Sequence, residues 1–401
     1  MKYDVKKMTG SIRDELSLLD EELSDEKVKD LIVERVFSGR AAAQCSAAEL
    51  KRIIDDIFHS LRSDLGLLQP FLEYESVSEI MVNGKDNVFV ERNGSLEKTD
   101  VAFAETSDLE EVIRRIAAGV HREINELNPI VDARLADGSR VNAVFGNIAI
   151  GGPVLTIRKF PEKGFDMEDL TGTGTISAEC AAFLERLVKA GYNIFISGGT
   201  SSGKTTFLNV LSDFIPGSER VIVIEDSAEL QIRNIENMVR MECRSANAEG
   251  KGRIEMRQLI RTSLRMRPDR IIVGEVRGGE VMEMINAMNT GHDGSLSTGH
   301  GNSVRGMLRR LESMFLEAAD FPIDAIRAQI LEGVDVIIHL GRMSDGSRKV
   351  LEVAELTGLS PEGEFITNTL FRYDPGRGLM ATGEKIKNSE KLVLKGYYDG
   401  H

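Results

Sequence analysis

Apolar side chains recur at helical spacing through the first 66 residues. They form three stripes: Leu16, Leu19 and Leu23; Val28, Leu31, Ile32 and Val36; and Leu50, Ile53, Ile54, Ile57, Phe58 and Leu61. Residues three or four apart share one face of an α-helix, so each stripe is typical of the buried face of an amphipathic helix. Ser46 and Glu49 make the capping-box pattern before the third stripe. The pattern predicts a helical bundle over residues 1–66, either a structural appendage or a module that docks a partner.

From residue 67 the apolar runs become short, as in strands, and alternate with pairs that supply positive φ in tight hairpins. These pairs are Asn83-Gly84, Asn93-Gly94 and Asp137-Gly138. Between the second and third pairs, Ser107 and Glu110 predict the cap of a helix. A last strand is expected at Val154–Ile157. The pattern predicts a compact α+β domain over residues 67–160.

Residues 161–175 are rich in Gly, Thr and acidic residues and have no core pattern, so a linker is expected there. Beyond it, short β-branched runs alternate with helical stretches, which predicts a largely parallel sheet covered by helices over residues 176–401. The runs are Ile194–Ile196, Val221–Ile224, Ile271–Val273, Ser295–Thr298 and Val334–His339. Two later runs, Val350–Leu356 and Phe365–Phe371, are expected to extend the sheet antiparallel.

Composition narrows the class of protein. A chain of 401 residues is too long for one ordinary core, and a net charge of −14 with no Trp argues weakly against a nucleic-acid-binding surface, although local clusters can override it. Cys45, Cys180 and Cys243 lie far apart, so neither a zinc site nor a disulfide framework is expected. There is no signal peptide and no apolar run that spans a bilayer, which predicts a cytoplasmic protein.

The strongest chemical signal follows the first strand of the second domain. The residues are Gly198, Gly199, Thr200, Ser201, Ser202, Gly203, Lys204, Thr205 and Thr206. They match the G-x-x-x-x-G-K-[ST] pattern between a strand and a helix, where backbone N–H groups and the helix N-terminus hold phosphate oxygens. We expect Lys204 to reach the β- and γ-phosphates of ATP and the Thr205 hydroxyl to bind Mg²⁺.

Two acidic motifs follow predicted strands, at the edge where parallel sheets place their ligands. One, VIVIEDSAEL, contains Glu225, Asp226 and Glu229; the other, RIIVGEVRGGE, contains Glu275. Gly274 stands where many P-loop enzymes have an Mg²⁺-binding Asp. Hydrolysis needs a second anchor for the metal and a group that polarises water. The metal candidates are Thr205, Glu225, Asp226 and Glu275.

Histidines and arginines supply further candidates. In NTGHDGSLSTGHGNS, His292 and His300 flank a short polar strand, which suits a sensor of the γ-phosphate better than a zinc site. A helical stripe of arginines is either a solvated face or functional; its members are Arg257, Arg261 and Arg265. A second set is better placed to act as fingers across a cleft, and consists of Arg134, Arg140 and Arg158.

Taken in order, SGGTSSGKTT, IEDSAEL, LRMRPDRIIVGEVRGGE and NTGHDGSLSTGH resemble the type II/type IV secretion ATPase superfamily, and within it the CpaF family of Tad pilus motors. The resemblance runs from Leu67 to Phe371. Ser201 and Gly301 depart from it, since Gly and Ala are common at these positions. The tetracysteine insertion of some secretion ATPases is absent, which favours the CpaF branch.

The resemblance implies a ring-shaped homo-hexamer at the cytoplasmic face of a membrane, with a RecA-like ATPase domain after the α+β domain and ATP between the two. It implies that Glu275 is the Walker B carboxylate and Glu229 polarises water, although these two roles are interchangeable at this point. His292 and His300 become the histidine-box residues, and Arg134, Arg140 and Arg158 the cross-domain contacts.

The function so implied is a motor that hydrolyses ATP to assemble, or also retract, a Tad-type pilus. Its partners would be inner-membrane platform proteins and, indirectly, pilin subunits, with no nucleic acid. Two alternatives stay open. One is a traffic ATPase that moves protein or DNA, and the other is an ATP-dependent scaffold or switch that scarcely turns over.

Overall fold

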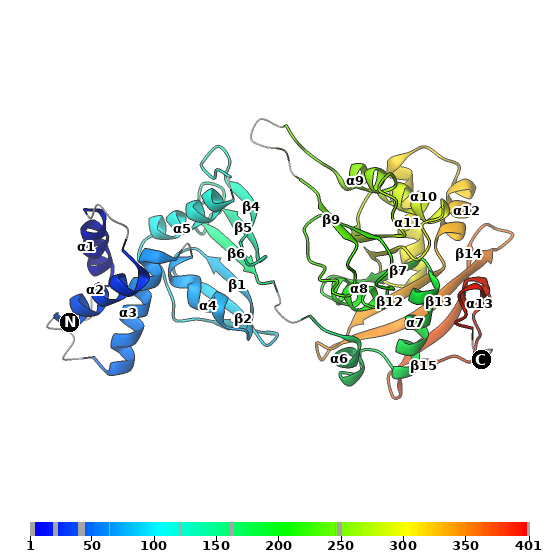
Figure 1. The fold of residues 1–401 in the computed structure, drawn as a ribbon, viewed down its shortest axis with the longest axis horizontal. Helices are drawn as coiled ribbons and strands as arrows, with labels where there is room; N and C mark the ends of the chain where they lie inside the picture. The colour runs from blue at the N-terminus through cyan, green and yellow to red at the C-terminus, as the bar shows by residue number, and fades with distance from the viewer. Residues whose placement is uncertain are drawn as a thin grey trace. The chain divides into compact units, whose positions relative to one another are not determined.

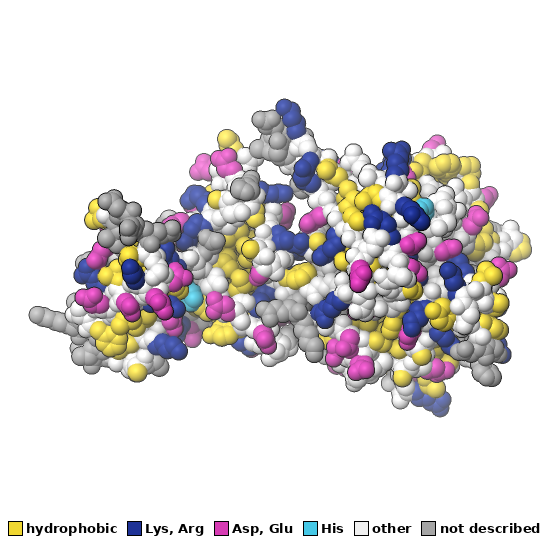
Figure 2. Space-filling model, viewed as in Figure 1, with side chains coloured by type: hydrophobic (Ala, Val, Ile, Leu, Met, Phe, Trp, Pro, Cys, Tyr) yellow, Lys and Arg dark blue, Asp and Glu magenta, His cyan; other side chains and the backbone are white. Residues whose placement is uncertain are grey.

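The computed structural model describes residues 5–18, 23–38, 45–63, 65–120, 122–160, 164–244, 246 and 251–398. The chain forms two compact units, Met1–Glu162 and Lys163–His401 (Figure 1). On the face seen in Figure 2, acidic and basic side chains are interspersed on each unit, so the net charge of −14 is not gathered into one patch there. None of the helices in the described residues is both long and apolar enough to span a bilayer.

Unit 1 begins with the three expected helices, α1 (Val5–Ser17), α2 (Asp25–Ser38) and α3 (Ala47–Arg62). Their apolar faces pack together around fully buried side chains, which are Ile12, Val28, Ile32, Val36 and Ile57. The predicted capping box is confirmed, because Ser46 Oγ accepts from the Glu49 N–H at 3.3 Å and Glu49 Oε2 accepts from the Ser46 N–H at 2.7 Å. Leu19 lies outside the described residues.

The rest of unit 1 is an antiparallel sheet with one long helix on it. After two short helices, η2 (Gly66–Leu68) and α4 (Gln69–Glu73), come β1 (Val77–Asn83), β2 (Val88–Arg92), β3 (Ser95–Lys98), α5 (Thr106–Gly119), β4 (Ile130–Arg134), β5 (Arg140–Val144) and β6 (Val154–Arg158). The strand order is β3-β2-β1-β6-β5-β4. The apolar side of α5, with Leu109 and Ile113, packs on the inner face of the sheet, which includes Ile80 and Val82.

Both hairpins predicted at Asn-Gly pairs are confirmed, whereas the predicted helix cap is wrong. Asn93-Gly94 forms its turn with φ of 51° and 78°; Asn83 stays in β1, and Gly84, with φ 68°, opens the loop that returns at Asn87. Gly84 packs there against Gly151, whose carbonyl oxygen would lie 2.5 Å from a Cβ. The helix after β3 is capped by Glu105 rather than Ser107, because Asp108 Oδ2 accepts from the Glu105 N–H at 3.0 Å.

Unit 2 is a nine-stranded sheet between two layers of helices. Its elements are α6 (Met167–Gly172), α7 (Ala178–Ala190), β7 (Ile194–Gly198), α8 (Lys204–Ser212), β8 (Val221–Glu225), β9 (Met238–Glu242), α9 (Met256–Ser263), β10 (Arg270–Val276), α10 (Val281–Asn289), β11 (Leu296–His300), α11 (Val304–Ala318), α12 (Ile323–Gly333), β12 (Val336–Arg342), β13 (Arg348–Leu359), β14 (Phe365–Asp374), β15 (Gly378–Ala381) and α13 (Glu390–Lys395). The strand order is β15-β14-β13-β12-β7-β11-β10-β8-β9.

The six strands from β12 to β9 are parallel, and β13 to β15 extend the sheet antiparallel. One core lies between the sheet and α7 and α8, and the other between the sheet and α9 to α12. The mixed α/β fold predicted from the sequence is confirmed, although β9, β15 and α13 were not foreseen. The segment expected as a linker contains α6, which Asp166 caps and Leu170 anchors.

Candidate active site

The loop between β7 and α8 has the geometry that its sequence predicts. Gly203 adopts φ 90° immediately before Lys204 opens α8. Ser202 Oγ donates to the Gly199 carbonyl at 2.9 Å, which closes the loop on itself. Ser201 adopts φ 58°, a left-handed conformation that costs a non-glycine residue about 1–2 kcal/mol.

Lys204 is the cation of this loop and is mostly buried, with 8% of its side chain exposed. Its Nζ donates to the Gly199 carbonyl at 3.2 Å and lies 3.6 Å from Glu275 Oε1. Burial lowers the pKa of Lys204, and the charge of Glu275 opposes that shift. Lys204, at the start of α8, is thus held at the loop by the carboxylate of Glu275 on β10.

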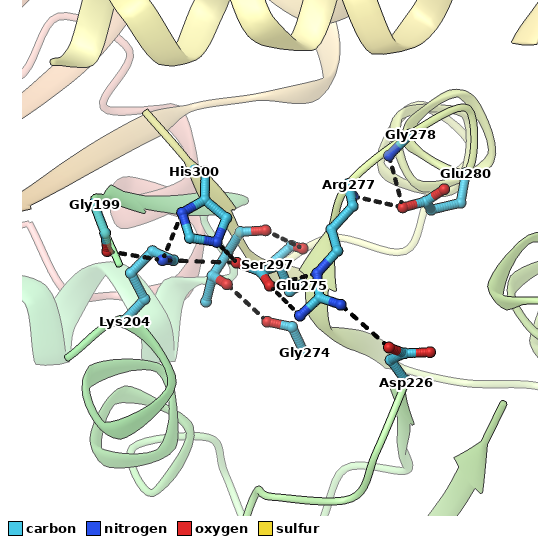
Figure 3. A network of polar contacts seen from close by, with 11 residues as sticks. Gly199, Lys204, Asp226, Gly274, Glu275, Arg277, Gly278, Glu280, Ser297 and His300 are labelled. Carbon is cyan, nitrogen blue, oxygen red and sulfur yellow. Dashed lines mark hydrogen bonds and ion pairs between the residues drawn. The ribbon is translucent and has the colours of Figure 1, made fainter. Parts of the chain in front are cut away.

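His300 completes the contacts of this lysine (Figure 3). Its Nδ1 lies 3.5 Å from Lys204 Nζ, and its Nε2 lies 3.1 Å from Glu275 Oε1. Burial and the nearby charge of Lys204 lower the pKa of His300, which favours the neutral ring. With its proton on Nε2, the ring donates to Glu275 and accepts from Lys204.

Glu275 lies at the centre of the network, with 18% of its side chain exposed. Its Oε2 accepts from Arg277 Nε at 2.7 Å, and Arg277 Nη1 reaches Asp226 Oδ2 at 3.2 Å. The carboxylate therefore contacts two cations and a histidine. The sequence contained a signal for the role of Arg277, because residues two apart at a strand end lie on the same side.

The sheet topology explains why these residues meet. Gly198 at the end of β7 pairs with His300 at the end of β11, and β10 beside β11 brings Glu275 to the same edge. Asp226 directly follows β8, the next strand along. Carboxyl ends of parallel strands share one edge of the sheet, so a site at this edge was predictable.

Glu225 has a different environment from the other acidic candidates. It is 3% exposed, and its Oε1 accepts from the N–H groups of Glu229 at 2.7 Å and Leu230 at 2.9 Å. Burial raises its pKa. A Cβ at Gly274 would lie 3.1 Å from Glu225 Cγ, so Glu225 fills the space beside the glycine. Its Oε2 lies 3.5 Å from Arg240 Nη2. These contacts make Glu225 a support for the segment that carries Glu229, and its role as a metal ligand stays a prediction.

The two candidate histidines are at opposite ends of β11. His292 precedes the strand, and its Nδ1 lies 3.2 Å from the Ala287 carbonyl at the end of α10. The five residues from Leu296 to His300 alone span about 13 Å at ~3.3 Å per residue. The structure thus brings His300 to the P-loop of this chain and does not bring His292 there.

The three arginines of unit 1 lie side by side on one face of its sheet. Arg140 pairs directly with Arg134 on β4 and with Arg158 on β6. Like charges at directly paired positions repel one another, and Glu79 on β1, which pairs with Arg158, places a carboxylate at the end of this row of positive charge. Its contact with the nucleotide stays a prediction.

The arginine stripe of unit 2 is held by a carboxylate. Glu283 is 7% exposed and contacts Arg257 Nε at 3.0 Å and Arg261 Nη2 at 2.7 Å. With Arg253, these arginines line a shallow hollow of about 360 Å³. Part of the stripe is therefore paired rather than simply solvated.

The described residues contain no cluster of three or more His, Cys, Asp or Glu side chains that would bind a metal by itself. Thr205, in the first turn of α8, and Glu275 and Asp226 at the same sheet edge are all oxygen donors, which is what Mg²⁺ requires. Mg²⁺ in phosphate sites takes few protein ligands and completes its shell with water and phosphate. The donor set therefore fits a magnesium ion that arrives with a nucleotide.

A comparison with protein families matches residues 62–368 to the family described as "Type II/IV secretion system protein". A Mycobacterium tuberculosis protein with a provisional conjugal transfer designation is 33% identical over 78% of this chain and 89% of its own length. The conjugal transfer protein TrbB of Rhizobium radiobacter is 32% identical over 72% of this chain and 86% of its own length. The type IV secretion system protein VirB11 of Bartonella henselae is 28% identical over 76% and 95%.

Two solved structures share the fold. The ATPase DotB of Legionella pneumophila has a TM-score of 0.52 and 20% identity, and the match covers 74% of this chain and 81% of DotB. The pilus retraction motor PilT with bound ADP has a TM-score of 0.52 and 19% identity, with 83% and 87% covered. These likenesses support the mixed α/β fold described above.

Proposed function

The chain belongs to the type II/IV secretion system protein family, and we propose that it is an ATP-hydrolysing motor of such a system. The observation that carries the proposal is the convergence of Lys204, Glu275 and His300 at the mouth of the P-loop. A P-loop lysine that holds phosphate and a carboxylate that orients water are two of the groups that phosphoryl transfer to water uses, and His300 contacts both of them here.

The role of each group follows from its charge and position. Lys204 and the backbone N–H groups at the start of α8 stabilise the negative charge of the β- and γ-phosphates. Glu275 accepts a hydrogen bond from water, and Arg277 beside it orients this carboxylate by donating to it. Neutral His300 donates a hydrogen bond from Nε2 to Glu275, and we assign to this histidine the role of sensing the γ-phosphate. Mg²⁺, when bound, neutralises charge on the phosphate oxygens.

Glu229 remains the alternative to Glu275 for orienting water. Its backbone is fixed by Glu225, and its charge acts on Arg277 at the edge of the network. The charges of both carboxylates act on Arg277, so the two roles stay interchangeable in this proposal.

The positive row of Arg134, Arg140 and Arg158 supplies the remaining charge in this proposal. An arginine that reaches the transferring phosphoryl group raises the rate by about 10³–10⁵-fold. The row would approach the nucleotide from unit 1 of the same chain or of a neighbouring copy in a homo-hexamer. ATP hydrolysis would then change the position of unit 1 relative to unit 2 and so do mechanical work.

We propose assembly of a Tad-type pilus as the specific task, with inner-membrane platform proteins as partners at the cytoplasmic face of the membrane. The motif order and the absence of a tetracysteine insertion support it. The second candidate is a transfer ATPase that moves protein or DNA, and the relatives named for conjugal transfer favour it.

The test of the motor proposal is ATP turnover of the full chain at increasing protein concentration, with light scattering on the same samples. We expect the turnover per chain to rise as rings form. Filter binding of DNA at low and moderate salt separates the two tasks, because a pilus motor is expected to bind no DNA at moderate salt. Tight ATP binding without turnover at every concentration would favour a scaffold or switch instead.

A further inference from the structure

Two polar side chains are directly paired at the centre of the unit 2 sheet. Ser197 on β7 and His339 on β12 are 0% and 8% exposed. Phe195 and Ile337, two residues before them on the same face, belong to the core beneath α9 to α12, and on the other side of β7 the strand β11 has buried Ser297 and Thr298. The Nδ1 of His339 lies 3.3 Å from the Ser197 Oγ.

A buried polar pair is a poor way to stabilise this sheet. One hydrogen bond between neutral groups contributes only about 1 kcal/mol net, whereas two packed aliphatic side chains at these positions would bury more apolar surface at no desolvation cost. Local departures of this kind are expected where function requires a defined geometry. The pair therefore calls for an explanation beyond stability.

Ser197 connects the pair to the active site. It directly precedes Gly198, and its Oγ fills the space beneath Gly301, the residue after His300. A Cβ at Gly301 would lie 2.6 Å from that oxygen. The Gly301 N–H also donates to the Gly198 carbonyl at 3.4 Å. The serine hydroxyl thus lies against the turn that carries the histidine. Together with Met307, whose Cα and Cβ lie 3.2 Å from the same Cβ position, it leaves space for glycine at 301.

His339 is well suited to hold this hydroxyl in place. Burial lowers its pKa, and the charge of Glu352, its partner on β13, opposes the shift. Glu352 is itself held by Thr369 Oγ1 at 2.9 Å and Arg372 Nη2 at 3.2 Å on β14. Among the described residues, Glu352 is the charged group whose field acts on this imidazole. The neutral ring of His339 accepts a hydrogen bond from the Ser197 hydroxyl at Nδ1. This hydrogen bond holds Oγ in its position beside Gly301.

We propose that His339 and Ser197 are positioning residues that set the separation between the P-loop and His300. The inference rests on the proposed function, because its effect is on the step in which Lys204, Glu275 and His300 act together. The two residues touch no substrate. They act through Gly198 on one side and Gly301 on the other.

The experiment compares four variants of the full chain: Ser197→Ala, His339→Leu, their combination, and His339→Gln, which keeps an acceptor. For each, kcat and the dissociation constant of ATP are measured in the presence of Mg²⁺, together with Tm. We expect each of the first two changes to lower kcat about tenfold and to change ATP affinity less than threefold. The double variant should lose no more than either single one, and His339→Gln should recover most of the loss.

Two further variants keep the test specific. Ser263→Ala removes a buried serine hydroxyl of α9 that donates to the Ile260 carbonyl at 2.7 Å, and it should leave kcat unchanged. Gly301→Ala should lower kcat by collision with Ser197 Oγ, and Ser197→Ala in the same chain should restore part of it.

Multiplicative losses in the double variant, or unchanged kcat in both single variants, would overturn the positioning role while leaving the ATPase proposal intact. If the wild-type protein itself neither binds nor hydrolyses ATP, the proposed function fails, and this inference fails with it.

Discussion

Lys204 Nζ lies 3.6 Å from Glu275 Oε1, so the cation expected to hold phosphate is already paired with the carboxylate expected to act on water. In water such a pair is worth little, but only 8% of the lysine and 18% of the glutamate side chain are exposed. In the proposed mechanism, a bound phosphate would compete with Glu275 for the lysine. Glu275 would then lose one of its two cationic contacts and accept a hydrogen bond from water more readily. This ion pair would link nucleotide binding to activation of the carboxylate.

The first prediction concerns Glu275→Gln. Removing this charge leaves the P-loop backbone and Lys204 in place, so ATP should bind as well as or better than in the wild type. Turnover should fall by about 10²–10³-fold, which is typical for loss of one positioned catalytic group. Single-turnover hydrolysis and equilibrium binding measure the two effects separately. Glu229→Gln is the matched comparison, and a larger loss there would exchange the roles of the two glutamates.

The second prediction concerns Glu225→Gln. The carboxylate accepts two backbone hydrogen bonds through Oε1, and an amide oxygen can accept the same two. Because burial raises the pKa of Glu225, the neutral amide also avoids a desolvation cost. We expect hydrolysis within a few-fold of wild type and unchanged Mg²⁺ dependence. Glu225→Leu, which cannot accept, should lower turnover through disorder of the Glu229 segment. A large rise in the Mg²⁺ requirement of Glu225→Gln would instead make Glu225 a metal ligand.

The third prediction concerns pH. The pKa values of His300 and His339 are both lowered below about 6.5, with burial as the first cause. A histidine whose pKa is lower in the folded than in the unfolded protein is protonated less readily in the folded protein. Its contribution to stability is therefore present above the pKa of the unfolded protein and is lost as the pH falls through the pKa of the folded protein. Urea midpoints should therefore drop between pH 7 and pH 5, and less steeply in His300→Gln or His339→Gln. A midpoint drop of equal steepness in both variants and wild type would contradict this assignment.

The fourth prediction concerns the arginine row of unit 1. Arg140 is exposed and lies between Arg134 and Arg158, so Arg140→Gln should change stability by no more than about 0.5 kcal/mol. Turnover should nevertheless fall by about 10³-fold if the row reaches the transferring phosphate. Arg114→Gln, on the exposed side of α5, serves as a control of equal charge change. Equal turnover in the wild type, Arg140→Gln and Arg114→Gln would show that the arginine row does not contribute to catalysis.

Much of the site was predictable because its chemistry lies in contiguous motifs at strand ends. The P-loop from Gly198 to Thr205 folds as its sequence pattern indicates. Glu275 and His300 could be assigned to one sheet edge because both follow predicted parallel strands. The strand-helix alternation likewise led to the correct α/β architecture for unit 2.

Other features depended on contacts that spacing does not reveal. His292 and His300 look like a pair in sequence, but a strand of five residues separates their positions in space. The burial of Glu225 and its two backbone donors are contacts that its position after a strand does not reveal. The pairing of Ser197 with His339 joins residues 142 positions apart, so only the register of β7 and β12 could show it.

The most direct test of the central claim is steady-state ATP hydrolysis by the wild type and by Lys204→Ala, with Mg²⁺ and with the metal chelated. Lys189→Ala is the matched control, because that lysine pairs with Glu185 on α7. We predict Mg²⁺-dependent hydrolysis by the wild type and Lys189→Ala, and loss of at least about 10²-fold in Lys204→Ala. Equal hydrolysis by Lys204→Ala and the wild type would contradict a catalytic P-loop at this sheet edge.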